Sequence, residues 1–159
     1  MRITLVIPVP DREMIFVQQP VEALYAATIL IEAGHEVSIV DARVQDPVLD
    51  RPEFVFVVTQ TYDLTQCNSI SLNNAASLVA TIKADHPGVP TVAVGMHASM
   101  EPEMTTRDLG VDASLPGELE VAIPGWSRRT ARTPRCCRRR WTPRRATPTR
   151  RPCRSPTTP

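Results

Sequence analysis

The stretch Pro90-Thr91-Val92-Ala93-Val94-Gly95-Met96-His97-Ala98-Ser99 decides the fold of this chain. An apolar, partly β-branched run that ends abruptly at a glycine is typical of a buried parallel strand followed by a tight turn. Glycine tolerates a positive φ and lets a ligand approach the main chain closely. Ligands of open α/β sheets bind beyond the carboxyl ends of the strands, so residues 95–99 are expected to face a ligand. A glycine that merely permits a turn gives the same pattern, and the prediction needs support from other loops.

Four more apolar runs, separated by helical patterns, accompany this strand. Strands that alternate with helices predict βαβ units, and therefore a parallel sheet with right-handed crossovers. Five strands of this size suit the doubly wound order 2-1-3-4-5, and we predict an α/β, flavodoxin-like (Rossmann-like) fold. The predicted strands span residues 3–7, 37–40, 54–58, 90–94 and 112–115, and the helices span 21–33, 71–85, 101–109 and the residues from 119 onward.

Two of the predicted helices have a clear apolar face. Residues that recur at intervals of three and four lie on one side of a helix, and that side packs on the sheet. Gly34 suits the end of the first helix, because a glycine at the C′ position adopts a positive φ without strain. The predicted face of the first helix comprises Val21, Leu24, Ala27, Thr28 and Ile31, and that of the second comprises Leu72, Ala75, Ala76, Val79 and Ile82.

Three loops meet at one edge of the predicted sheet. In the order 2-1-3-4-5 the ends of strands one, three and four surround the point where the strand order reverses, which is where such folds bind ligands. The loops are residues 9–19, 59–68 and 95–99, and they offer small residues, hydroxyls and amides. They contain no glycine-rich phosphate loop and no nucleophile elbow, so we predict no catalytic residue. Such a surface suits a large neutral or weakly charged ligand.

Charge divides the chain in two. Residues 1–124 carry seventeen acidic and six basic residues, a net charge of −11, whereas residues 125–159 carry twelve arginines and no acidic residue. The second segment lacks a hydrophobic period and is predicted to be disordered. An arginine-rich tail could bind nucleic acid or an anionic membrane. We favour a frameshift instead, because the tail begins where a last helix should continue and its restricted alphabet fits a G+C-rich coding sequence read out of frame.

The predicted division is a domain over residues 1–124 and a tail over residues 125–159. Because only Leu119–Ile123 of the last helix remains in this division, the domain is expected to have marginal stability and to aggregate. Four cysteines without C-x-x-C spacing predict neither a disulfide framework nor a metal site. We recognise no signal peptide and no membrane-spanning run, and expect a cytoplasmic protein without a membrane partner.

Several short stretches, taken in order, resemble the cobalamin (B12)-binding domain at the N-terminus of B12-dependent radical SAM enzymes. The resemblance covers about residues 1–124 and implies that the nucleotide tail of cobalamin enters a slot beside the sheet, with the corrin across the carboxyl edge of the strands. The matching stretches are Met1–Pro8, Ala26–Asp41, Val92–Ala98, Asp108–Ala113 and Gly117–Glu120. The implied slot residues are Thr59, Thr61, Gly95, His97 and Ala98, and Gly117 and Glu118 complete the implied cofactor site.

The chain departs from this family at two points. Met96 stands where the family often has a second glycine, and its side chain would crowd the ligand. The C-x-x-x-C-x-x-C motif is absent, so an iron–sulfur cluster and S-adenosylmethionine would belong to a missing domain. B12 domains that bind through a histidine carry D-x-H-x-x-G after the first strand, and this motif is absent here. In agreement with the radical SAM group, the resemblance therefore implies cobalamin without a protein histidine on its cobalt. His35 and His86 precede strands two and four and are expected at the opposite edge, as turn residues.

The sequence therefore favours a cobalamin-binding module, the truncated N-terminal part of a B12-dependent radical SAM methyltransferase or related enzyme, without catalysis of its own. Cobalamin is the predicted cofactor and partner. The alternative is a nucleotide- or sugar-binding α/β domain of glycosyltransferase-like type. A third possibility is a protein that binds nucleic acid through residues 125–159.

Overall fold

The computed structural model describes residues 1–11, 19–59 and 72–131, with the backbone alone over residues 127–131. In this part of the chain five parallel strands form one sheet in the order β2-β1-β3-β4-β5, which confirms the predicted α/β fold. The strands are β1 (Arg2–Ile7), β2 (Glu36–Asp41), β3 (Phe54–Val58), β4 (Thr91–Val94) and β5 (Ala113–Leu115). The helices are α1 (Val21–Glu32), α2 (Asn73–Asp85), α3 (Met96–Met100), α4 (Pro102–Leu109) and α5 (Leu119–Ala131).

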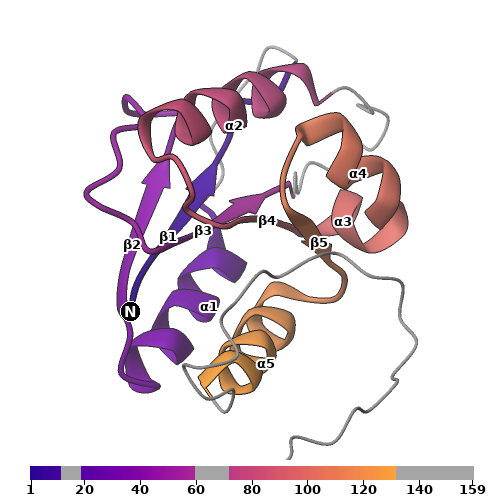
Figure 1. The fold of residues 1–159 in the computed structure, drawn as a ribbon. Coiled ribbons are helices and arrows are strands. Elements are labelled where there is room, and N and C mark those ends of the chain that lie inside the picture. Colours follow the sequence, from indigo (N-terminus) through magenta and orange to yellow (C-terminus); the bar gives the residue numbers. More distant parts are fainter. Residues whose placement is uncertain (12–18, 60–71, 132–159) are drawn as a thin grey trace, which may run out of the picture.

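The helices cover both faces of the sheet (Figure 1). α1 and α5 lie side by side on one face, while α2 lies on the other face with α4 next to it. Successive side chains of a strand point to opposite faces, so each strand contributes to both layers. None of the helices described is long and apolar enough to cross a bilayer.

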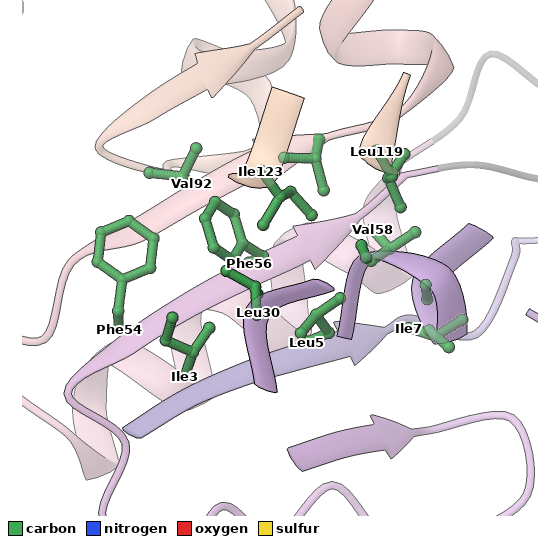
Figure 2. Packing of buried hydrophobic residues seen from close by; sticks show 13 residues of the cluster. Ile3, Leu5, Ile7, Leu30, Phe54, Phe56, Val58, Val92, Leu119 and Ile123 are labelled. Carbon is green, nitrogen blue, oxygen red and sulfur yellow. The ribbon is translucent and has the colours of Figure 1, made fainter. Parts of the chain in front are cut away.

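The larger apolar cluster lies between the sheet and the pair α1 and α5 (Figure 2). β1 and β3 form its floor with every second residue, as expected for strands that are covered on both faces. All five residues of β3 are buried. Among the side chains packed in this cluster are Ile3, Leu5 and Ile7 of β1, Phe54, Phe56 and Val58 of β3, Leu30 of α1, and Leu119 and Ile123 of α5.

The apolar face predicted for α1 is wrong. Of the predicted residues only Ala27 is buried, whereas Val21 and Ile31 are 44% and 56% exposed. Both the predicted and the observed face fit the same spacing of three and four, so periodicity alone does not choose between them. Alanines at the contact let the helix backbone approach the sheet closely, which larger side chains would prevent. The buried side chains of α1 are Ala23, Ala26, Ala27 and Leu30.

The end predicted for the last helix is also wrong. The sequence confined this helix to Leu119–Ile123, but α5 continues through Pro124 and Gly125 to Ala131. Leu119 and Ile123 are fully buried, and the ring centroid of Trp126 lies 4.1 Å from that of Phe54. Burial of these side chains outweighs the low helix propensity of the Pro-Gly pair. The marginal stability was inferred from a helix that ends at Ile123, and α5 extends beyond that residue. Residues 132–159 lie outside the described part of the chain.

Two glycines end helices with a positive φ, and Gly34 does so as the sequence predicts. Gly34 follows α1 with φ +84°, and Gly110 ends α4 with φ +68°. Residues 95–99, in contrast, were predicted as a loop, whereas the structure forms the short helix α3 with Gly95 as its N-cap at φ +105°. The chain therefore turns sharply at Gly95 and enters α3 immediately after β4.

Asp112 ties the beginning of β4 to the beginning of β5. Its carboxylate accepts hydrogen bonds from the backbone N–H and the hydroxyl of Thr91, at 2.8 and 3.0 Å, and pairs with Lys83 Nζ at 2.9 Å. Burial by itself raises the pKa of Asp112. The hydrogen bonds from Thr91 and Lys83, together with the Lys83 charge, outweigh burial and hold this pKa below its ordinary value.

We expect Asp112→Asn to lower the free energy of unfolding by about 1 kcal/mol at neutral pH, a modest value because the Asp112 side chain is 40% exposed. The folded pKa is depressed, so this contribution is present above the unfolded pKa of about 3.9 and is lost as pH falls through the folded value. Urea denaturation of both proteins across this range measures the difference. A difference that stays constant down to about pH 3 would contradict the assignment.

Candidate functional site

The predicted site residues gather at the carboxyl edge of the sheet. Because all the strands are parallel, the segments that follow them emerge at this one edge. Residues 12–18 and 60–71 belong to these segments and lie outside the described part. The second range includes the predicted site residue Thr61, and also Cys67. The site is therefore built from Thr59, α3 and the turn before α5. His35 and His86 lie at the opposite edge, before β2 and before β4, as predicted.

Thr59 and His97 are in direct contact. His97 Nδ1 lies 2.7 Å from the carbonyl oxygen of Thr59, which links the end of β3 to α3. The Thr59 side chain is 4% exposed, and its hydroxyl donates to the carbonyl of Val94 at 2.8 Å. The hydroxyl of Thr59 is therefore engaged in a hydrogen bond within the protein, whereas the imidazole of His97 is only half-buried.

Ala98 packs in the core. Its side chain is fully buried in the apolar cluster between the sheet and the layer of α2 and α4, which also contains Leu109 and Val111. A methyl group in this position anchors α3 against the sheet and cannot itself line a slot. If Ala98 contacts a cofactor, as predicted, it does so through its backbone atoms.

Ser99 joins two loops that the sequence predicted separately. Its hydroxyl donates to the carbonyl of Gly95 at 2.9 Å and accepts from the backbone N–H of Gly117 at 2.9 Å. Gly117 has φ +113°, a conformation that strongly favours glycine. The predicted residues Gly95 and Gly117 are thus held at one place by a side chain between them. Glu118, the next predicted residue, is exposed beside this junction.

Asp11, at the start of the segment after β1, caps α2. Its two carboxylate oxygens accept hydrogen bonds from the backbone N–H groups of Asn73 and Asn74, at 2.9 and 2.7 Å. These N–H groups have no partner within the helix, and an anionic acceptor there is also favoured by the helix dipole. Asp11 therefore fixes the beginning of α2 to the carboxyl end of β1.

The charges of this edge are mainly negative. Oε2 of Glu120 is buried without a hydrogen-bond partner among the described residues. Arg43, after β2, donates to both carboxylate oxygens of Asp41, at 2.8 and 2.7 Å. Burial raises the pKa of Asp41, but the hydrogen bonds from Arg43 and its charge outweigh burial and leave this pKa below its ordinary value. As far as the structure describes it, the edge suits a neutral ligand better than a polyanion.

Sequence reasoning missed the contacts of three side chains that shape the site. Ser99 lies one helical turn after Gly95, and a serine four residues after a turn glycine is a signal that could have been read as a local hydrogen bond. Asp11 acts on partners that are distant in the sequence, and Thr105, in α4, acts on a residue of the preceding helix α3. Thr105, fully buried, donates to the carbonyl of His97 at 2.9 Å. No local pattern reveals either contact.

Comparison with known proteins identifies the fold. No protein-family model and no curated protein matches the sequence. The structure is similar to that of TsrM, a radical S-adenosylmethionine methyltransferase from Kitasatospora setae, solved with cobalamin and a 4Fe-4S cluster bound. The TM-score is 0.62 over 84% of this chain, with 18% sequence identity, and the chain spans 25% of the length of that methyltransferase. At this identity the similarity establishes a shared fold.

Proposed function

We propose that this chain is a cobalamin-binding module related to the N-terminal part of a B12-dependent radical SAM methyltransferase. One observation carries the proposal: most of the chain shares its fold with a methyltransferase that was solved with cobalamin bound. The carboxyl edge of the sheet, where α/β proteins of this type bind ligands, is also where the candidate residues meet.

The residues at this edge fit such a ligand. Gly117 brings an exposed backbone without a side chain to this edge, the buried Gly95 turns the chain into α3, and His97 and Ser99 supply polar atoms. Cobalamin is large and rich in neutral carboxamides, so it needs hydrogen-bond partners and shape rather than countercharges. When bound, it supplies the cobalt centre that carries and transfers a methyl group. The residues of this chain would hold the ligand, orient it and exclude water from it.

We also propose that the cobalt has no histidine ligand from this chain. Residues 8–20, which follow β1, contain no histidine, and the carboxylate of Asp11 is engaged with α2. An iron–sulfur cluster and S-adenosylmethionine would be held by another domain, since residues 1–131 contain Cys67 as their single cysteine. The net charge of −11 over residues 1–124 disfavours nucleic acid as a partner of this domain.

The full chain is expected to retain hydroxocobalamin through a desalting column, with close to one corrin per protein in the visible spectrum. Cobinamide, which lacks the nucleotide tail, should be retained less, because the proposed slot holds that tail. The absorbance of the protein fraction measures both. His86→Asn, at the opposite edge of the sheet, serves as the matched control and should bind as the wild type does.

A colourless protein that is folded by circular dichroism would contradict the proposal. Thermal stabilisation by a nucleoside diphosphate sugar, with none by hydroxocobalamin, would favour the glycosyltransferase-like alternative. Equal retention of cobalamin and cobinamide would support cobalamin as the ligand and contradict the proposed slot for its nucleotide tail.

A further inference from the structure

The His97 imidazole is fixed in one tautomer by the end of β3. Its Nδ1 lies 2.7 Å from the backbone oxygen of Thr59. A carbonyl oxygen can only accept a hydrogen bond, so Nδ1 must carry the proton in this contact. The neutral ring therefore has a lone pair, and no hydrogen, on Nε2.

Both partners in this contact are held by the surrounding structure. Thr59 donates its backbone N–H and its hydroxyl to the carbonyl of Val94, each at 2.8 Å, and is almost fully buried. The backbone carbonyl of His97 accepts from the hydroxyl of Thr105 and from the N–H of Glu101, each at 2.9 Å. The ring is thus attached to β3 while its main chain is attached to α4, which restricts its position.

Nε2 makes no hydrogen bond to any residue that the structure describes. The ring is half-buried and is secured through Nδ1, so Nε2 is the ring atom available to a ligand at this edge. Such an Nε2 accepts from an N–H or O–H donor. A phosphate oxygen at neutral pH offers no such hydrogen.

We infer that His97 Nε2 accepts a hydrogen bond from a carboxamide N–H or a ribose hydroxyl of the bound cofactor, and that Thr59 and Thr105 are the positioning residues that make this possible. The inference rests on the proposed cobalamin-binding function. It assigns His97 to recognition of the organic part of the cofactor rather than to the cobalt or to the phosphate.

Two substitutions separate the two nitrogens. In His97→Asn the side-chain amide can replace Nδ1–H toward Thr59, but nothing replaces Nε2. In His97→Gln the amide reaches the position of Nε2 and can accept there, while the contact with Thr59 is lost. We expect His97→Asn to weaken hydroxocobalamin binding about tenfold with an unchanged melting temperature. His97→Gln should bind within about threefold of the wild type and melt at a lower temperature.

The tautomer is measured separately in the full-length protein without cofactor. Long-range proton–nitrogen NMR correlations of the ¹⁵N-labelled chain should show His97 with hydrogen on Nδ1. The signals lost in His97→Asn identify His97, and those lost in His86→Asn identify His86, which leaves the third set to His35. Hydrogen on Nε2 would overturn the inference. So would a wild type that binds hydroxocobalamin while His97→Asn binds it equally well, and in that case the proposed function stands. A folded wild type that binds no cobalamin rejects both.

A cobalt ligand is the competing role for Nε2. Electron paramagnetic resonance of the bound cobalt(II) form tests it directly. We expect no nitrogen splitting from an axial base in the wild type. Axial nitrogen splitting that disappears in His97→Asn would make His97 the cobalt ligand and would overturn the assignment to a carboxamide or hydroxyl.

Discussion

Replacing Trp126 with alanine is expected to lower the free energy of unfolding by about 3 kcal/mol. The Trp126 ring contacts two aromatic side chains of β3: its centroid lies 4.1 Å from that of Phe54, and 5.3 Å from that of Phe56 in an edge-on arrangement of 88°. Aromatic pairs of this kind add about 0.5–1.5 kcal/mol to the burial of apolar area. Because Trp126 is half-buried, the value lies at the low end for a tryptophan deletion.

Urea denaturation followed by circular dichroism measures the effect in the full chain. Val121→Ala is the matched control, because Val121 lies on the same helix and is 70% exposed. It should change stability by less than about 0.5 kcal/mol. If the two variants lose the same small amount, Trp126 does not belong to the core, as a domain that ends at residue 124 requires.

The strand order could be predicted from the sequence, and the packing of α1 could not. Buried parallel strands are short apolar runs in which nearly every residue is apolar, and Phe54–Val58 illustrates this without ambiguity. In α1 two stripes satisfy one spacing rule. The stripe with larger side chains, including Val21 and Leu24, faces outward because the contact with the sheet requires alanines. Periodicity identifies a helix, but fit against the neighbouring layer selects its face.

The end of α5 shows a second limit of local patterns. Pro124-Gly125 is a strong local signal for a helix to stop, and residues 125–159 change abruptly in composition. Ile123 and Trp126 nevertheless pack on β3 from the same helix, and that contact is visible only once the strand is in place. Tertiary burial here overrides propensity, which is weak for individual residues.

The candidate site could be predicted as an edge, but not as a set of contacts. The predicted order of strands places Thr59, Gly95 and Gly117 at one edge, and the structure adds how they are joined. The contact of His97 with Thr59 spans 38 positions, and that of Ser99 with Gly117 spans 18. Hydrogen bonds between residues so far apart in sequence leave no local pattern, so they follow only from the fold.

Gly95→Ala is expected to lower the free energy of unfolding by about 2 kcal/mol and to abolish retention of hydroxocobalamin. Gly95 is buried between β4 and α3 with φ +105° and ψ −162°, a conformation that is essentially restricted to glycine. A methyl group there forces the backbone to rotate. Because α3 begins at the next residue, the rotation moves His97 and Ser99 together, and both link α3 to its surroundings through contacts of 2.7–2.9 Å.

Gly34→Ala is the control that separates the general effect of backbone strain on stability from an effect on the binding site. Gly34 has φ +84° after α1, at the opposite edge of the sheet, and an added Cβ would meet no atom within 4 Å. Its substitution should cost about 1 kcal/mol and leave cobalamin retention unchanged. Thermal melts and desalting of the two variants, each compared with the wild type below its melting temperature, give both readouts. If Gly95→Ala retains cobalamin as Gly34→Ala does, the turn after β4 does not form part of the binding site, since its displacement would then leave the ligand undisturbed.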